Sequence, residues 1–143
     1  MRSLFPDVCT DRLETSRDFY AALFGFRVLF EAPGWYVQLQ SPADPNLQLA
    51  FVQRDHASVP EGFRDAPRGV LVTVETDDVD AVHRRARALG LEPVYALRSE
   101  PWGQRHFMVT DPNGLLVDVV QLIPADESFL RAHGVQLGAA GAE

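Results

Sequence analysis

The sequence contains one pattern twice, and this repeat limits the possible fold more than any other feature. Phe24-Gly25-Phe26 recurs 65 residues later as Leu89-Gly90-Leu91, and Asp-Pro-Asn occurs late in each half, at 44–46 and 111–113. In both halves a strand-like segment precedes a helix-like one, and three strand-like segments follow. One such unit cannot bury its sheet face alone, so two must pair, within one chain or between chains. We expect one α+β domain over residues 1–143, in which two tandem β-α-β-β-β modules form a curved mixed sheet around a ligand-sized cleft.

The expected elements follow from apolar periodicity and from the glycines and prolines that interrupt it. Module 1 covers residues 1–53, a linker covers 54–68, module 2 covers 69–123, and a tail covers 124–143. Strands are predicted at 4–10, 26–31, 35–40, 47–53, 69–75, 92–97, 105–110 and 115–122, helices at 14–24 and 79–89, and a short helix in the tail through His133. The first strand contains Pro6 and is expected at an edge or to start late. Thr15 or Ser16 is predicted to cap the first helix, and Asp77 and Asp78 suit the start of the second. The final six residues, 138–143, are expected to fray.

Charge and cysteine content exclude several classes of protein. The net charge is −7, so the basic footprint of a nucleic-acid-binding protein is absent. Cys9 is the only cysteine, which excludes an internal disulfide and a Cys-rich zinc module. No apolar segment has the length of a signal peptide core or a membrane span, so we expect a cytoplasmic protein with no membrane partner.

Two sets of motifs resemble one known family. Residues 13–20 (LETSRDFY) and 23–26 (LFGF) are similar to a signature of the vicinal oxygen chelate superfamily, which includes glyoxalases, extradiol dioxygenases and bleomycin-resistance proteins. Residues 77–81 (DDVDA) and 111–114 (DPNG) resemble the marks of its second module. Residues 101–107 (PWGQRHF) are similar to a segment of the bleomycin-resistance branch. The resemblance covers roughly residues 4 to 122 and implies the fold described above.

The resemblance also implies where a metal would be held, because metal enzymes of this family place one ligand on each of four strands. These positions correspond to Phe5, Gln48 (or Ala50 if the register slips by two), Leu71 and Asp118. Phe5 and Leu71 end in carbon and cannot bind an ion, and the two remaining oxygen donors would hold a transition metal poorly. We therefore expect no metal and no cofactor, and we disfavour a divalent ion at these positions.

The residues expected in the cleft combine carboxylates with apolar side chains. Strand alternation places Asp7 beside Phe5, Glu75 beside Leu71, and Asp118 inside an otherwise apolar strand. A buried carboxylate is costly unless it is paired, so Asp118 is either a ligand-binding or catalytic group or half of a structural salt bridge. The four histidines are expected on the surface or in packing.

Two tryptophans and an arginine complete the predicted ligand-binding set. Trp35 and Trp102 offer flat faces for stacking on a planar or cationic molecule, and Arg105 is expected to pair with a ligand anion or with Asp118. The full set is Phe5, Asp7, Trp35, Gln48, Leu71, Trp102, Arg105 and Asp118.

These observations favour a homodimeric, metal-free protein that sequesters an antibiotic-like small molecule, as in antibiotic resistance. The first alternative is an enzyme of the same superfamily: a lyase, isomerase or dioxygenase that uses a metal at a shifted site or acid–base chemistry on Asp118. The second is an interaction module with no small ligand.

Overall fold

The computed structural model describes residues 1–135 and contains two halves with the same order of elements. The ends of the elements lie close to the expected ones. The first half contains β1 (Asp7–Thr10), α1 (Leu13–Phe24), β2 (Arg27–Ala32), β3 (Tyr36–Gln40) and β4 (Gln48–Gln53). The second contains β5 (Leu71–Glu75), α2 (Val79–Ala88), β6 (Tyr95–Glu100), β7 (Gln104–Thr110) and β8 (Leu116–Leu122), and α3 (Glu127–Ala132) follows. The predicted fraying at 138–143 lies outside the described residues.

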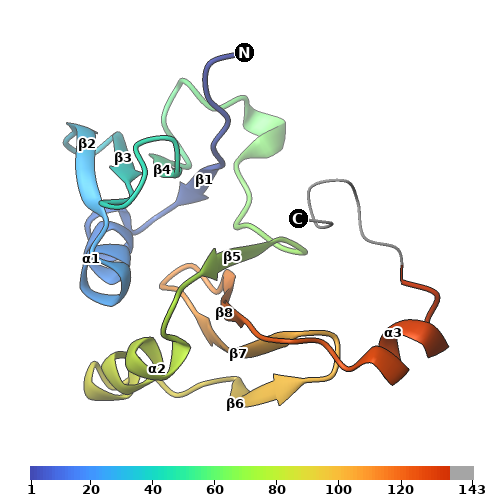
Figure 1. Cartoon of the computed structure of the whole chain (residues 1–143). Coiled ribbons are helices and arrows are strands. Elements are labelled where there is room, and N and C mark those ends of the chain that lie inside the picture. Colours follow the sequence, from blue (N-terminus) through green and yellow to red (C-terminus); the bar gives the residue numbers. More distant parts are fainter. Residues whose placement is uncertain (136–143) are drawn as a thin grey trace.

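Each half forms its own four-stranded mixed sheet, as the repeat predicts. The strand order is β1-β4-β3-β2 in the first sheet and β5-β8-β7-β6 in the second. In each sheet the first strand runs parallel to the last, and the other pairs are antiparallel. The two β-α-β-β-β modules of an α+β fold are therefore confirmed (Figure 1).

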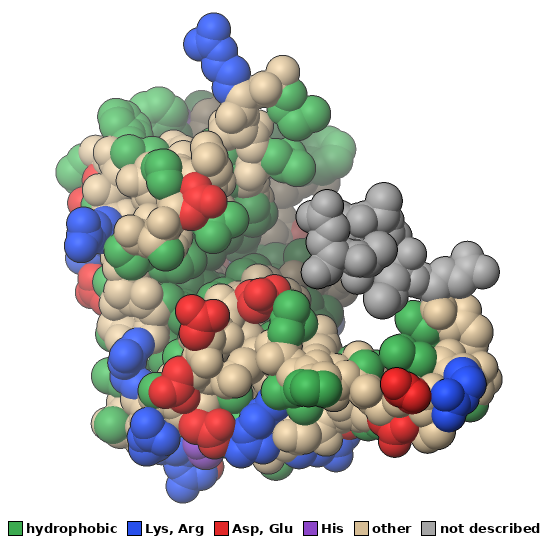
Figure 2. All heavy atoms as spheres, in the orientation of Figure 1, with side chains coloured by type: hydrophobic (Ala, Val, Ile, Leu, Met, Phe, Trp, Pro, Cys, Tyr) green, Lys and Arg blue, Asp and Glu red, His purple; other side chains and the backbone are tan. Residues whose placement is uncertain are grey.

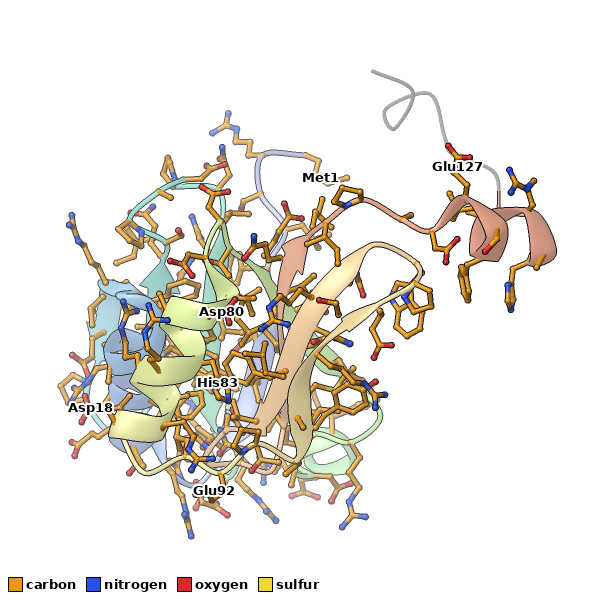
Figure 3. All side chains as sticks on the ribbon, turned by 60° about the horizontal axis from the view of Figure 1, so that its bottom comes forward. Met1, Asp18, Asp80, His83, Glu92 and Glu127 are labelled. Carbon is orange, nitrogen blue, oxygen red and sulfur yellow. The ribbon has the colours of Figure 1, made fainter. Side chains whose placement is uncertain are left out.

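The helices lie between the two sheets. Helix α1 contacts β3 and β4, α2 contacts β7 and β8, and the two helices contact each other. A single apolar core joins Tyr20 and Leu23 of α1, Val82 and Ala86 of α2, and Phe107 of β7. Figure 1 shows both helices inside the angle between the sheets, and Figure 3 shows α2 lying against the second sheet. The opposite surface of each sheet, called its open face below, therefore points away from the helix layer.

The ends of the helices partly match the expected signals. Gly25 has φ +71° and ends α1, and the Asp78 side chain accepts from the backbone N–H of Ala81 at the start of α2, as predicted. The cap of α1 at Thr15 or Ser16 is wrong, because the helix starts at Leu13 without a side-chain cap. The Thr10 hydroxyl instead accepts from the N–H of Arg12 at 2.8 Å.

Strand β6 differs most from its expected position. It covers residues 95–100 instead of 92–97, and its register with β7 shifts between Tyr95 and Arg98. Pro93 has no N–H to donate, so regular pairing begins only after Val94, whose N–H binds the carbonyl of Met108 at 2.9 Å. Strand β1 starts late, after Pro6, as the sequence suggests.

Candidate functional site

The open face of the first sheet carries two of the residues predicted to bind a ligand. Asp7 pairs in register with Ala50, which also lies opposite Gln38, and Gln40 lies opposite Gln48. These positions alternate with Val8, Leu39 and Leu49, which are buried in the core on the helix side. Asp7 and Gln48 therefore lie on the open face, and Phe5 immediately precedes β1.

Gln48 is already engaged by its neighbours. Its side-chain oxygen accepts from Gln38 Nε2 at 2.5 Å, and its own Nε2 donates to the carbonyl of Pro45 at 2.8 Å. Asp7 is different, because none of the residues 1–135 forms an ion pair with it, and burial raises the pKa of its carboxyl group. Asp7 is therefore a carboxylate on this face whose charge the described part of the chain does not compensate.

The raised pKa of Asp7 leads to a stability prediction. A group whose pKa is higher in the folded than in the unfolded state stabilises the fold when it is protonated. This stabilisation is complete below the unfolded-state pKa, about 4, and is lost as pH rises through the folded-state pKa. Asp7→Asn removes this titration, so the free energy of unfolding of the variant should rise relative to that of the wild type as pH increases from 3 to 7. Because the carboxyl group of Asp7 is only partly shielded from solvent, we expect a gain of only a few tenths of a kcal/mol. Chemical unfolding at several pH values measures it, and a variant less stable than the wild type at pH 7 would contradict the assignment.

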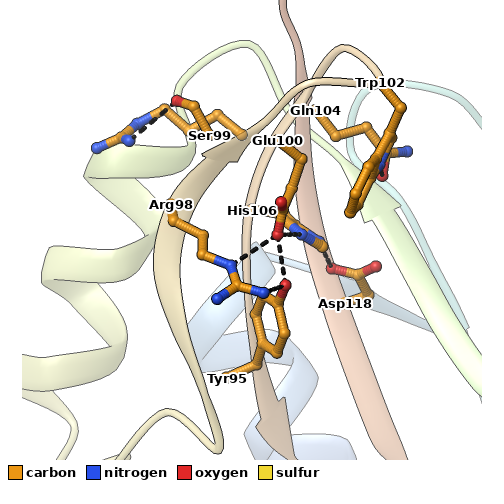
Figure 4. Close-up of polar contacts among 9 residues, drawn as sticks. Tyr95, Arg98, Ser99, Glu100, Trp102, Gln104, His106 and Asp118 are labelled. Carbon is orange, nitrogen blue, oxygen red and sulfur yellow. Dashed lines mark hydrogen bonds and ion pairs between the residues drawn. The ribbon is translucent and has the colours of Figure 1, made fainter. Parts of the chain in front are cut away.

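The second sheet carries a buried polar cluster on its open face. Asp118 of β8 lies opposite Thr73 of β5 and Met108 of β7, and its carboxylate contacts Nδ1 of His106 at 2.9 Å. Nε2 of His106 contacts Glu100 of β6 at 3.3 Å, and the Glu100 carboxylate also accepts from Tyr95 and Arg98 (Figure 4). The side chains of His106 and Asp118 are only 4% and 11% exposed. The cluster is therefore held by interactions within the protein.

Glu100 is the carboxylate that the most side chains of this cluster contact. It faces Nε2 of His106 and accepts from Arg98 and Tyr95. Burial opposes ionisation of Glu100, but the hydrogen bonds from Arg98 and His106 outweigh it and lower the pKa of this carboxyl group. Glu100 thus stabilises the fold above about pH 4, and this contribution is lost as pH falls through its folded-state pKa.

Two residues of the predicted ligand-binding set form contacts within the chain. Arg105 does not pair with Asp118. It lies on the helix side of β7 and makes two hydrogen bonds to Asp80 of α2, at 2.8 and 3.0 Å. Trp35 stacks on His56 from the segment between the halves and donates to Ser58.

Of the two tryptophans, Trp102 lies nearer the buried polar cluster. Its ring packs edge-on to His106 and against Phe129 of α3, and 42% of the residue remains exposed. It therefore offers apolar surface beside the Asp118–His106 pair.

The residue that sequence reasoning missed is His106, which was expected to be a surface or packing histidine. The signal that could have found it is the Asp111–Gly114 turn, because a tight turn there sets Thr110 opposite Leu116 and His106 opposite Val120. Strand alternation then places His106 and Asp118 on one face.

The four positions that the family resemblance assigns to metal ligands do not fit a metal. Phe5 and Leu71 offer carbon, the amide of Gln48 is occupied, and Asp118 is bound to His106. Within residues 1–135, no three His, Cys, Asp or Glu side chains converge to hold an ion. The side chains at these four positions therefore give no basis for a metal-dependent step.

The two halves meet at a junction with a cavity at each end. At one end Tyr20 donates to Asp111 at 3.0 Å, Thr10 donates to Asn113 at 2.5 Å, and Asn113 donates to Ser16. Thr10 and Asn113 also line a cavity of about 160 Å³. At the other end a larger groove of about 410 Å³ lies between the end of α1 and the start of α2. The modules thus contact each other directly within one chain.

Comparisons with known proteins agree with this architecture. A family model described as "Glyoxalase/Bleomycin resistance protein/Dioxygenase superfamily" matches residues 4–119. No curated protein matches the chain significantly. Within residues 1–135, no helix is long and apolar enough to span a membrane.

Among solved structures, the chain is similar to TnmS3, an antibiotic-binding protein from Streptomyces sp. CB03234. The two are 25% identical over 85% of this chain and 96% of TnmS3, with a TM-score of 0.66. TioX from Micromonospora sp. ML1 is 22% identical over 85% of this chain and 98% of TioX, with a TM-score of 0.67. A lactoylglutathione lyase from Agrobacterium tumefaciens is 21% identical over 82% of this chain and 91% of the lyase, with a TM-score of 0.66. The last two likenesses show the fold alone.

Proposed function

Because this chain belongs to the Glyoxalase/Bleomycin resistance protein/Dioxygenase superfamily, we propose that it binds and sequesters an antibiotic-like small molecule without a metal. The observation that carries the proposal is the chemistry of the open faces. They present exposed apolar and aromatic surface at Leu71 and Trp102 and an uncompensated carboxylate at Asp7, and residues 1–135 place no three His, Cys, Asp or Glu side chains together to hold an ion. Such a surface suits a planar guest that carries a positive charge.

The position of the helices supports a homodimer as the binding unit. Helices α1 and α2 fill the space between the two sheets of one chain, so the open faces of the halves point away from each other. A cleft between two open faces then requires a second copy, in which the first half of one chain faces the second half of the other. Exposed apolar side chains on or next to these faces, such as Phe30, Leu71 and Leu122, favour this arrangement.

The test is a titration of the metal-free protein with planar aromatic antibiotics, with and without a basic amine, and with a glycopeptide antibiotic. Trp35 and Trp102 are the only tryptophans, so single Trp→Phe variants show which indole reports binding. We expect binding to quench Trp102, and Trp102→Leu to weaken it about tenfold. Asp7→Asn should weaken an amine-bearing ligand about fivefold and leave its uncharged analogue unchanged.

Two measurements in the same experiment can contradict the proposal. Sedimentation at the protein concentrations of the titration gives the oligomeric state, and a monomer that binds no compound removes both the dimer and the binding function. Elemental analysis of protein purified without added metal tests the enzymatic alternative. One divalent ion per chain would favour a lyase, isomerase or dioxygenase over sequestration.

A further inference from the structure

The two ends of the junction between the halves are built from corresponding residues, but hydrogen bonds bridge one end and a groove remains at the other. Thr10 at the end of β1 corresponds to Thr76 after β5 in the internal repeat. At the Thr10 end the five-residue β7–β8 connection, 111–115, inserts Asp111 and Asn113 into the first half by hydrogen bonds. At the Thr76 end the β3–β4 connection is longer, seven residues from 41 to 47, and the 410 Å³ groove remains beside it.

Apolar side chains form part of the wall of this groove. They belong to Leu23 and Phe24 at the end of α1, to Phe26 at the start of the following segment, and to Val74 and Val82 of the second half. Val82 occupies the repeat position of Ser16, so an apolar side chain replaces the hydroxyl that joins the halves at the other end. The groove therefore offers a ligand hydrophobic contact where its counterpart offers hydrogen bonds.

The rim of the groove carries an excess of negative charge. Glu75, Asp77 and Asp78 line it, and Arg85 is the only cationic residue among its lining residues. Its Nη1 donates to the carbonyl of Leu23 in the groove wall at 2.8 Å, and its single positive charge offsets only part of the charge of these three carboxylates. Asp78 caps α2, whereas Glu75 and Asp77 form no salt bridge with any of the residues 1–135. Figure 2 shows carboxylates gathered on the second half near the waist between the halves.

We infer that this junction groove is a second binding site, separate from the open faces, for a small organic cation with an apolar body. Phe24, Phe26 and Val74 would receive the apolar part, and Glu75 and Asp77 would face the ammonium group. A rim with two uncompensated carboxylates disfavours an anion, and a volume of about 410 Å³ suits a ligand of one or two rings.

The experiment is an NMR titration of the full-length protein with phenethylammonium, using 2-phenylethanol and 3-phenylpropanoate as neutral and anionic isosteres. A ligand of this size should bind with a Kd of about 1–10 mM, with shifts at Phe24, Val74 and Ala81. We expect the neutral compound to bind about fivefold more weakly and the anion not to bind measurably. Ala81→Phe, which fills the groove, should abolish the shifts there, and the double variant Glu75→Gln, Asp77→Asn should remove the preference for the cation.

The control is the double variant Glu14→Gln, Asp11→Asn, which removes the same two negative charges at exposed positions. Asp11 lies at the opposite end of the junction, and Glu14 lies in the first turn of α1. This variant should not change the affinity of phenethylammonium for the groove. Equal binding of all three compounds, or shifts confined to the open faces, would overturn the inference. Asp7 and Trp102 are not part of the groove. A negative result in the NMR titration therefore does not bear on antibiotic binding at the open faces, and a negative antibiotic titration does not bear on the groove.

Discussion

Replacing Asp111 by alanine is expected to lower the free energy of unfolding by about 3 kcal/mol, because its carboxylate joins the two halves. Asp111 is 5% exposed and accepts from the Tyr20 hydroxyl and from the backbone N–H groups of Asn113 and Leu115. Alanine leaves these donors buried without an acceptor and also removes the side chain that shapes the β7–β8 turn. Urea unfolding followed by far-UV circular dichroism measures the loss.

Asp111→Asn and Tyr20→Phe are the matched controls for this prediction. Asparagine keeps one acceptor oxygen, so we expect a loss of about 1 kcal/mol, and removing the Tyr20 hydroxyl should cost about as much. In a double-mutant cycle, Tyr20→Phe should add little once Asp111 is alanine, because the hydrogen-bond acceptor is already absent. A loss below 1 kcal/mol for Asp111→Ala, or full additivity, would show that this contact does not hold the halves together.

Replacing His106 by leucine is the second change with a large expected effect. It leaves the buried carboxylate of Asp118 without the ring nitrogen at 2.9 Å, so we expect a loss of about 3 kcal/mol in the free energy of unfolding. Combining His106→Leu with Asp118→Leu should recover about 2 kcal/mol of that loss, since no buried carboxylate is then left without a partner.

Arg105→Leu is the control for this cycle, because it removes the neighbouring residue of the same strand. Arg105 pairs with Asp80 at the solvent-exposed side of α2, where an ion pair contributes little. We expect its unfolding midpoint to stay near that of the wild type. If His106→Leu is equally mild, the polar cluster is not a structural unit, and a role for Asp118 in binding or catalysis gains support.

The sequence predicted the fold well because the repeat and the apolar alternation are local signals. Gly25 and Asp78 end and begin helices as expected, since their conformational and hydrogen-bonding properties act over a few residues. The predicted cap of α1 is wrong because the helix starts at Leu13, before Thr15 and Ser16, and no side chain caps it. Residue preference alone predicts a capped start, whereas here the Thr10 hydroxyl at the end of β1 accepts from the N–H of Arg12.

The site was harder to predict because it depends on which face a side chain occupies and on distant partners. Arg105 and His106 are adjacent, so they point to opposite sides of β7, and only the strand register decides which one meets Asp118. The contact of Trp35 with His56 depends on the path of the segment between the halves, which has no periodicity to read. That the side chains of Phe5 and Leu71 cannot bind an ion, in contrast, follows from the residue types alone.

The hydrogen bonds that join the halves also bear on how the repeat can evolve. Tyr20 and Ser16 of the first copy are matched by polar groups of the second, and Arg85 of the second copy satisfies a carbonyl at the end of α1. A copy on its own would bury these groups without partners or expose them together with its apolar helix face. Each copy therefore depends on the other for these partners, so the molecule should melt in a single transition and a change on one side of the junction is constrained by the other side.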